Sequence, residues 1–312
     1  MLTPETSSGA EILRLRDRLL IAPGDAGAMS DLAALLETTG DLPGAIDLYQ
    51  RALRVDPYQV DVVLALGRDW AALGDLVRAR SWFERALAID EDCAGAAEGL
   101  ARLDPDGAMT PAYIRTLFDQ YATRFDQELT QTLGYRAPQC VAAALDRAGL
   151  AESSADMLDL GCGTGLSGVA LCRFARRLEG VDLSPGMIEQ AWVRAIYAEL
   201  TVADAVGFLS AAARNWDVVA AVDVLNYVGD LTALFAAAAG KLTDGGLLAG
   251  TVEKGEGGVA LTGKRRYVHG ADHLRAALQA AGLPLLDLAE EDLRNEGGVP
   301  VAGLVFVARR EK

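Results

Sequence analysis

The hydrophobic and small residues of the first hundred positions recur with a spacing of 34 residues. Corresponding positions carry side chains of the same kind: Gly40, Ala45, Tyr49, Ala52, Leu53 and Asp56 match Gly74, Ala79, Phe83, Ala86, Leu87 and Asp90. The dipeptides Gly40-Asp41 and Gly74-Asp75 are turn signals at the same offset in each stretch. Small residues such as Ala33 and Gly67 let neighbouring helices approach closely, with an aromatic side chain in the groove. The pattern predicts two units, each a pair of antiparallel helices.

A period of 34 residues with these small and large positions is typical of tetratricopeptide repeats. In the same register, residues 11–21 predict one helix of a degenerate earlier repeat, and residues 94–103 predict a closing helix. Two full repeats are fewer than the ~3 usually needed for stability, so we expect the array to pack on the rest of the chain or on another copy. The turn cluster that begins at Asp104-Pro105 predicts the end of an all-α domain over residues 1–104.

The second half of the chain alternates short hydrophobic runs with helical stretches. Strands are expected at residues 156–160, 178–181, 200–202, 218–222, 247–252, 285–288 and 301–308. Helical stretches between the first five predict a doubly wound, mostly parallel sheet of seven strands, which is an α/β Rossmann-like fold. The last two strands, joined by the turn Gly297-Gly298, predict an antiparallel hairpin at the sheet edge. Residues 105–150 are expected to form a helical lid or linker segment of this domain, whose body spans residues 151–312.

A glycine-rich loop follows the first of these strands. Its residues are Asp159, Leu160, Gly161, Cys162, Gly163, Thr164 and Gly165. A part of it also fits the fingerprint of dinucleotide-binding proteins. The strand is expected to end at Leu160, so that the turn begins at Gly161, and the loop contains no Lys or Arg for a phosphate. The Asp159 carboxylate would repel a pyrophosphate but can accept hydrogen bonds from the ammonium of a methionine group. These features favour S-adenosylmethionine over NAD.

Two further acidic residues follow the next two strands. Asp182 can accept hydrogen bonds from both ribose hydroxyls, a feature shared with NAD proteins. Asp204 can accept one from the adenine amino group, although a lone Asp after a strand is usually a helix cap. Three acids at three successive strand ends favour a ligand site. Other expected cofactor contacts are Leu183, Met187 and Ala205 around the adenine ring, the small Cys162 beneath the cofactor, and Asp223 at the end of the fourth strand.

Residues 157–308 resemble class I S-adenosylmethionine-dependent methyltransferases. Asp159 to Gly165 are similar to the first motif of that family, Asp182 to its ribose acid and Asp204 to its adenine-contacting acid. The segments 118–126, 133–138 and 266–269 resemble a bacterial group of tetratricopeptide-containing predicted methyltransferases. The resemblance implies a methyltransferase activity and leaves the substrate unassigned.

The segment 111–133 predicts an amphipathic helix with Phe118, Tyr121 and Phe125 on one face. This face either packs in a core or forms a lid over the cofactor. In the lid interpretation, the hydroxyls of Tyr121 and Tyr135 contact the cofactor carboxylate, with Arg136 nearby. The lid interpretation predicts that the segment orders when cofactor binds.

Residues on the acceptor side carry weaker signals. Methyl transfer depends mainly on alignment, and a general base is needed only when the acceptor must lose a proton. His269 and His273 are expected at the start of one helix; His269 is a candidate base or a surface helix-capping residue, and Tyr227 is a second candidate. With no third ligand evident, a metal site is not expected. The basic residues at 264–266, with Arg294, form either a solvated loop or a site for an acidic substrate.

The composition of the chain excludes several classes of binding partner. A formal net charge of −15 argues against nucleic acid and anionic membranes, and the motif of enzymes that methylate base amino groups is absent after the fourth strand. No apolar run reaches the ~18 residues of a spanning helix, and the first residues lack signal-peptide features, so a cytoplasmic location is expected. The four cysteines are far apart and predict buried thiols.

The leading hypothesis is therefore a methyltransferase that uses S-adenosylmethionine on a small-molecule hydroxyl or carboxylate, whose repeats stabilise it or self-associate. Alternatives are a protein methyltransferase that recruits its substrate through the repeats, and a non-catalytic repeat scaffold that binds the cofactor. An NAD-dependent oxidoreductase is disfavoured by the loop register and by the lack of a catalytic pair.

Overall fold

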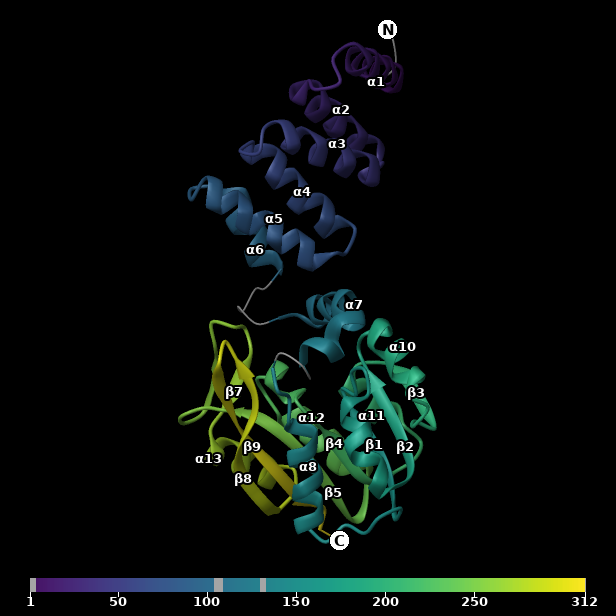
Figure 1. Ribbon diagram of the computed structural model, residues 1–312, viewed down its shortest axis with the longest axis vertical. Coiled ribbons are helices and arrows are strands. Elements are labelled where there is room, and N and C mark those ends of the chain that lie inside the picture. The colour runs from purple at the N-terminus through teal and green to yellow at the C-terminus, as the bar shows by residue number, and fades with distance from the viewer. Residues whose placement is uncertain (1–3, 104–108, 130–132, 312) are drawn as a thin grey trace. The chain divides into compact units, whose positions relative to one another are not determined.

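The structure is a computed structural model that describes residues 4–103, 109–129 and 133–311 (Figure 1). The chain divides into two compact units, Met1–Thr116 and Leu117–Lys312, referred to below as the repeat unit and the sheet unit. The boundary falls inside one helix, α7 (Pro111–Gln127), so that residues 117–127 of this helix belong to the sheet unit. The helix was expected to reach residue 133, and residues 130–132 lie outside the described part.

Helices alone build the described part of the repeat unit. They are α1 (Pro4–Ile21), α2 (Ala26–Thr39), α3 (Leu42–Val55), α4 (Val60–Ala72), α5 (Leu76–Ile89) and α6 (Ala94–Leu103). The pairs α2/α3 and α4/α5 are the two expected repeats, and α6 is the expected closing helix. The helix expected at 11–21 lies within α1. The 34-residue periodicity therefore identifies the helical architecture correctly.

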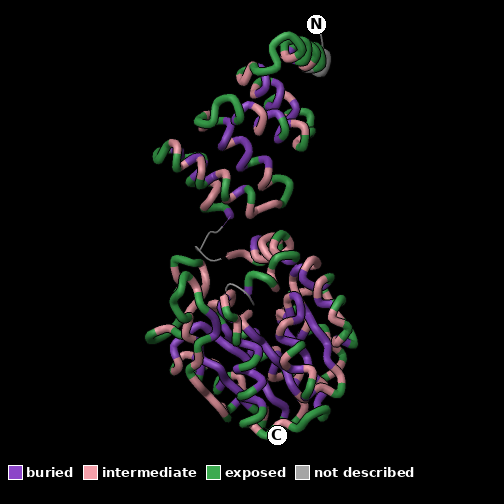
Figure 2. Tube along the Cα trace, viewed as in Figure 1, coloured by how far each residue is buried: buried purple, intermediate pink, exposed green. Residues whose placement is uncertain are grey.

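The repeated residues form the turns and the close helix contacts that the pattern predicts. Gly40 ends α2 in the left-handed conformation with φ +84°, and the Asp41 carboxylate then accepts a hydrogen bond from Gly44 N at 3.0 Å to cap α3. A Cβ atom on Gly67 would lie 2.5 Å from the ring of Phe83, so glycine permits this close helix contact. Buried residues are shown in purple along α2 to α5 in Figure 2. The core of the repeat unit thus depends on small residues placed against aromatic rings.

The sheet unit alternates strands with helices. Its strands are β1 (Ala155–Leu160), β2 (Ala175–Asp182), β3 (Glu199–Val202), β4 (Trp216–Ala221), β5 (Leu242–Lys254), β6 (Val259–Leu261), β7 (Tyr267–His269), β8 (Leu285–Glu296) and β9 (Val299–Arg309). Its helices after α7 are α8 (Ala137–Arg147), α9 (Leu166–Leu171), α10 (Pro185–Val193), α11 (Ala205–Ala211), α12 (Thr232–Lys241) and α13 (Ala271–Ala280). A 3-10 turn, η3 (Leu225–Tyr227), follows β4.

The central sheet has the order β3-β2-β1-β4-β5 with all neighbours parallel. Strand β9 pairs antiparallel with β5 and with β8, which confirms the expected hairpin. The described sheet contains nine strands rather than the expected seven, because β7 extends it parallel to the end of β5 and β6 pairs antiparallel with β7. These two strands have three residues each, too few for a periodic signal.

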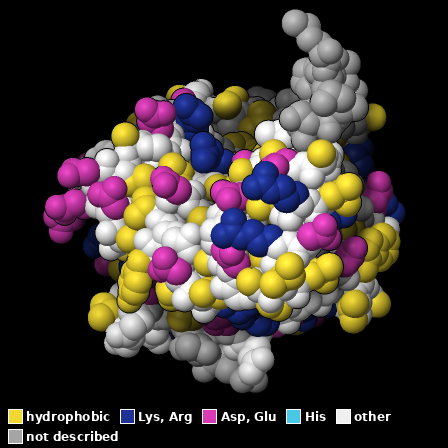
Figure 3. All heavy atoms as spheres, turned by 90° about the horizontal axis from the view of Figure 1, so that it is seen from above, with side chains coloured by type: hydrophobic (Ala, Val, Ile, Leu, Met, Phe, Trp, Pro, Cys, Tyr) yellow, Lys and Arg dark blue, Asp and Glu magenta, His cyan; other side chains and the backbone are white. Residues whose placement is uncertain are grey.

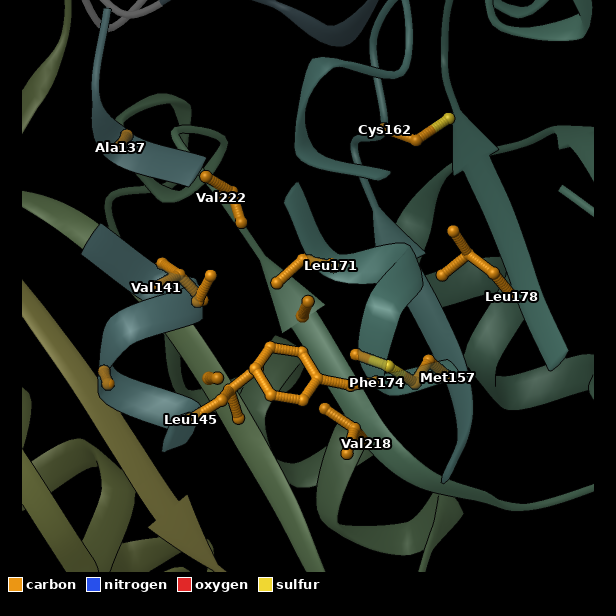
Figure 4. Close-up of a cluster of buried hydrophobic side chains, with 14 of the residues drawn as sticks. Ala137, Val141, Leu145, Met157, Cys162, Leu171, Phe174, Leu178, Val218 and Val222 are labelled. Atoms are coloured by element: carbon orange, nitrogen blue, oxygen red, sulfur yellow. The ribbon is translucent and has the colours of Figure 1, made fainter. Parts of the chain in front are cut away.

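Two hydrophobic cores lie on opposite faces of the sheet. Side chains alternate along β1, so that Met157 joins the core beneath α8 and α9, whereas Leu158 and Leu160 join the core with α11 and α12. Figure 4 shows the first core, in which the fully buried side chains of Phe174 and Leu145 lie between α8 and the sheet. Both faces of the parallel strands are covered, and the carboxyl ends of the strands remain available for a site.

Candidate cofactor and acceptor site

The glycine-rich loop begins where the sequence predicted. Strand β1 ends at Leu160, and Gly161, Gly163 and Gly165 all adopt positive φ, with values of +66°, +53° and +90°. A Cβ atom on Gly161 would lie 2.5 Å from Val224 Cγ2, so only glycine fits between the loop and the residues after β4. The loop therefore runs close beneath the ends of β1 and β4.

Asp182 is the last residue of β2 and ties two loops together. Its Oδ2 atom accepts a hydrogen bond from Gly163 N at 2.9 Å, and its Oδ1 atom accepts one from Ser184 N at 2.8 Å. Burial raises the pKa of Asp182, although these backbone amides act in the opposite direction. The predicted ribose acid and the glycine-rich loop are thus brought together in one hydrogen-bonded unit.

Asp159 is fully buried under the loop. Its Oδ2 atom accepts hydrogen bonds from Ser167 Oγ at 2.6 Å and from Tyr197 OH at 2.7 Å, whereas Oδ1 is buried without a hydrogen-bond partner among the described residues. Burial raises the pKa of Asp159 to about 6. A buried acceptor without a donor is unfavourable by about 1–3 kcal/mol, so Oδ1 is suited to a donor supplied by a ligand.

Asp204 is the N-cap of α11, and its Oδ2 atom accepts a hydrogen bond from Gly207 N at 2.7 Å. The helix-cap interpretation is therefore correct for one oxygen, while the residue remains exposed. Leu183 and Ala205 are half-buried, and Met187 is buried in the first turn of α10. Their expected contacts with an adenine ring remain predictions.

Cys162 lies inside the loop with its side chain buried. Burial raises the pKa of this thiol well above its ordinary value. A neutral, buried thiol is a packing residue rather than a nucleophile.

The aromatic face of α7 contacts the site. The ring of Phe118 meets the rings of Phe125 and Tyr227 edge to face, at centroid distances of 6.0 and 5.5 Å, and Tyr121 meets Phe125 at 5.9 Å. A Cβ atom on Gly163 would lie 3.9 Å from the Phe125 ring. Residues 117–127 therefore lie against both the glycine-rich loop and η3.

The polar groups of the predicted lid, on Tyr121, Tyr135 and Arg136, differ in their surroundings. Burial and the nearby Glu128 carboxylate raise the pKa of Tyr121 to about 12. Burial also raises the pKa of Tyr135, whose hydroxyl lies within the electrostatic reach of Asp223 and Asp159. Arg136 is exposed at the start of α8, where its backbone N donates to Leu293 O at 2.8 Å. Tyr135 is thus brought to the strand ends, whereas the Arg136 side chain is directed to the surface.

Asp223 follows β4 in the left-handed conformation, with φ +54°. Its backbone N donates to Thr251 Oγ1 at 2.9 Å, and both of its carboxylate oxygens accept from Arg294 Nη1, at 2.9 and 3.1 Å. Burial raises the pKa of Asp223 to about 6, against the effect of Arg294. Asp223 is therefore held rigidly by residues of β5 and β8.

Arg294 is buried and Arg266 is half-buried in a network of ion pairs, to which the exposed Lys264 is joined. Glu253 accepts hydrogen bonds from Arg294 Nη2, from Arg266 Nε at 2.6 Å and from Asn226 Nδ2 at 3.4 Å. Glu296 accepts from Arg266 at 2.6 Å, from Arg294 at 2.9 Å and from Lys264. The solvated-loop expectation was wrong for Arg266 and Arg294, because carboxylates from distant strands neutralise them.

The two histidines do not share a helix. His269 ends β7, Gly270 caps α13, and His273 lies in the first turn of that helix. Their rings stack at a centroid distance of 5.5 Å, and His269 is fully buried, which rules out a surface capping role. Burial lowers the pKa of His269, so the ring is neutral near pH 7. Tyr227 lies in η3, and burial raises the pKa of its hydroxyl.

Three acidic residues of the site were not selected from the sequence. Asp119 and Asp126 of α7 bind the loops around Asp182 and Thr164, and Glu253 joins the network beside Asp223. The repeated Phe-Asp dipeptide, at 118–119 and 125–126, was a signal for the first two. Glu253 had none, because its partners are remote in sequence.

In the face shown in Figure 3, acidic and basic side chains are interspersed with hydrophobic ones. Within residues 4–103, 109–129 and 133–311, no helix is both long and apolar enough to cross a membrane.

Comparison with known families matches both halves of the chain. Residues 133–288 match a family described as methyltransferase domain, and residues 10–60 and 36–103 match two families described as tetratricopeptide repeat. The fold is similar to that of the cyclase SpnF, with a TM-score of 0.53, 18% identity, and coverage of 65% of this chain and 98% of that chain.

Two curated relatives illustrate the sequence similarity. Human methyltransferase-like protein 27 is 40% identical over 87 residues, which is 27% of this chain. A ubiquinone biosynthesis O-methyltransferase of Cereibacter sphaeroides is 28% identical over 154 residues, which is 47% of this chain. The chain spans 35% and 54% of the length of these two proteins.

Proposed function

Because the chain belongs to the methyltransferase-domain family, we propose that it transfers a methyl group from S-adenosylmethionine to the hydroxyl of a small molecule. The observation that carries the proposal is the joined unit of Asp182 and the glycine-rich loop, at the carboxyl ends of β1 and β2. When bound, the cofactor supplies an electrophilic methyl group on a sulfonium. The residues of the chain then bind the cofactor, orient the acceptor and exclude water from the site.

Each acid has a role that fits its surroundings. The Asp182 carboxylate, at the end of β2, receives the ribose hydroxyls. The Oδ1 atom of Asp159, which has no partner among the described residues, accepts a hydrogen bond from the methionine group. Asp204 caps α11 with one oxygen, and its exposed carboxylate can also accept a hydrogen bond from the adenine amino group. The positive φ of Gly163, +53°, suits glycine and directs its backbone amide to Asp182. These acceptors fit a nucleoside that carries an amino acid group and not a pyrophosphate.

A hydroxyl acceptor is supported by the buried network. Three cations, Lys264, Arg266 and Arg294, face three carboxylates, so the network as a whole is neutral. An anionic acceptor would have to draw a cation away from its carboxylate, and a carboxylate left without its partner in a buried position is unfavourable. The ubiquinone biosynthesis relative is itself named as an O-methyltransferase. We therefore favour a neutral hydroxyl acceptor over a carboxylate.

His269 and Tyr227 remain the candidate catalytic residues. A buried, neutral imidazole can accept the proton that a hydroxyl loses as its oxygen attacks the methyl carbon and the carbon–sulfur bond breaks. Tyr227 keeps its proton near pH 7 and can orient the acceptor by a hydrogen bond. Replacement of His269 by Gln is expected to lower kcat and to remove a base-dependent limb of its pH profile, without weakening cofactor binding.

Calorimetry with S-adenosylhomocysteine tests the cofactor assignment. Wild-type protein is expected to bind it and not NAD, and Asp182→Ala is expected to weaken binding by about tenfold or more, since two hydrogen bonds to a charged group are lost. Glu189→Ala, at an exposed position of α10, is the matched control. Binding of NAD in place of the nucleoside product would refute the proposal.

The repeats support a second candidate, a protein substrate recruited by the repeat unit. Removal of residues 1–104 separates the two. Turnover of small hydroxyl compounds by the remaining chain would support the small-molecule proposal, whereas loss of turnover on a protein substrate alone would support recruitment. Cofactor binding without turnover on either class of substrate would indicate a non-catalytic scaffold.

A further inference from the structure

Helix α7 presents two carboxylates to the cofactor loops from one face. Asp119 and Asp126 are seven residues apart, a spacing that places them on the same side of a helix. Each follows a phenylalanine, so the aromatic contacts and the carboxylate contacts of α7 alternate along the same two turns. The carboxylates reach two different loops.

Asp126 holds the glycine-rich loop. One of its oxygens accepts a hydrogen bond from Thr164 Oγ1, and the other accepts from Arg194 Nη2. The Nε atom of Arg194 in turn donates to the carbonyl oxygen of Thr164. Thr164 is buried, and both its hydroxyl and its carbonyl oxygen are hydrogen-bonded. The loop cannot shift without breaking the contact with α7.

Asp119 holds the loop after β2. A single oxygen, Oδ1, accepts hydrogen bonds from Ser184 Oγ at 2.5 Å and from Gly186 N at 3.0 Å. The same Ser184 donates its backbone N to Asp182, and Asp182 accepts from Gly163 N in the glycine-rich loop. The contacts close a circuit from α7 through the glycine-rich loop to Asp182, and back to α7 through Ser184.

We propose that Asp119 and Asp126 are positioning residues for the cofactor, which couple the docking of α7 to the geometry of Asp182 and the glycine-rich loop. The inference rests on the proposed function, since it concerns the same cofactor site. By thermodynamic linkage, whatever factor α7 docking adds to cofactor affinity, the cofactor adds to α7 docking. Neither aspartate needs to touch the cofactor.

The two aspartates respond differently to conservative replacement. The two hydrogen bonds from the loop after β2 both go to Oδ1 of Asp119, so the amide oxygen of Asp119→Asn can still accept them. Both oxygens of Asp126 accept hydrogen bonds, and Asp126→Asn removes the negative charge that faces the guanidinium of Arg194.

The test is calorimetry of S-adenosylhomocysteine binding to the full chain. Asp119→Ala, Asp126→Ala and Asp126→Asn are expected to raise Kd by about tenfold, within the usual range of coupling between sites, whereas Asp119→Asn is expected to lose less affinity than Asp119→Ala. The exposed Gln127→Ala is the control and is expected to bind as wild type does. Wild-type affinity in both alanine variants would overturn the inference and leave the proposed function intact.

Hydrogen exchange provides an independent measure that also covers a variant with poor stability. In wild type, the product is expected to slow exchange of the amides of residues 117–127, and in Asp126→Asn this slowing is expected to disappear. Equal slowing in both proteins would count against the coupling. A wild-type protein that does not bind the product at all would contradict the proposed function, and the coupling with it.

Discussion

Replacement of Arg294 tests how the buried ion pairs of Asp223, Glu253 and Glu296, referred to as the acceptor side, stabilise the sheet unit. The Arg294 side chain is 3% exposed and contacts Asp223, Glu253 and Glu296. Replacement by methionine keeps most of the volume and removes the charge and all donors. Among the described ion pairs of these carboxylates, those with Arg266 and Lys264 would then remain.

The expected loss of stability is large. Removal of one partner of a buried ion pair is unfavourable by about 3–5 kcal/mol, because the remaining charges lose their compensation. For a unit of the size of Leu117–Lys312, 1 kcal/mol corresponds to about 2–4 °C in Tm, so Arg294→Met should lower Tm by about 6–20 °C. The exposed pair of Arg147 and Asp287, at 2.6 Å and with the Arg147 side chain 44% exposed, provides the control. Arg147→Met should change stability by less than about 1 kcal/mol.

The loss should also depend on pH. Asp223 has a pKa of about 6 in the folded protein against an ordinary value of 3.8, so the folded state binds this proton more tightly than the unfolded state. Stability from this group is therefore present below pH 4 and is lost as pH rises through 6. Arg294 limits the effect, and without it the pKa of Asp223 rises further. The difference between wild type and Arg294→Met should be smallest near pH 5 and largest near pH 8.

Differential scanning calorimetry of both variants and wild type at pH 5 and pH 8 measures these quantities. A Tm decrease below about 3 °C at pH 8, or one that is equal at both pH values, would refute the interpretation of Arg294 as the compensating charge of a buried network. Equal losses for Arg294→Met and Arg147→Met would refute it as well.

Three further predictions concern other parts of the chain. Gly67→Ala should destabilise the repeat unit by about 1–3 kcal/mol in urea unfolding, because its Cβ would lie 2.5 Å from Phe83. Gly161→Ala, at φ +66°, should lower Tm and abolish detectable binding of S-adenosylhomocysteine, and unchanged binding would contradict the loop geometry. Burial and Glu37 raise the pKa of Asp69 to about 7, so stability is lost as pH rises through 7; Asp69→Asn should remove this dependence in urea unfolding at pH 5 and pH 8.

Local sequence patterns predicted most of the helices and strands and the point at which the glycine-rich loop begins. The register of the loop at Gly161 and the placement of Asp182 at the end of β2 depend on residues that are adjacent in sequence, and periodicity identifies their strands. The repeat helices follow for the same reason. The roles of Asp159, Asp182 and Asp204 toward the cofactor stay predictions, together with the other expected contacts.

The acceptor side could not be predicted in the same way. Arg294 and Glu253 lie on β8 and β5, and their contact depends on how β9 pairs with both strands. His269 was assigned to a helix because Tyr267–His269 is too short to show alternation. Side chains that meet only through the order of strands leave no local pattern in a single sequence.

The position of β9 has a consequence for synthesis of the chain. It is the last strand, yet it lies between β5 and β8, so β8 cannot join the sheet before β9 is available. A nascent chain that has reached only residue 298 exposes the unpaired edge of β5, a surface prone to strand–strand aggregation. At that stage Arg294 also lacks the strand that would bring it to Asp223. The contact of Arg294 with Asp223 therefore waits for β9, whereas β1 and β2, which hold the glycine-rich loop and Asp182, are made earlier in synthesis.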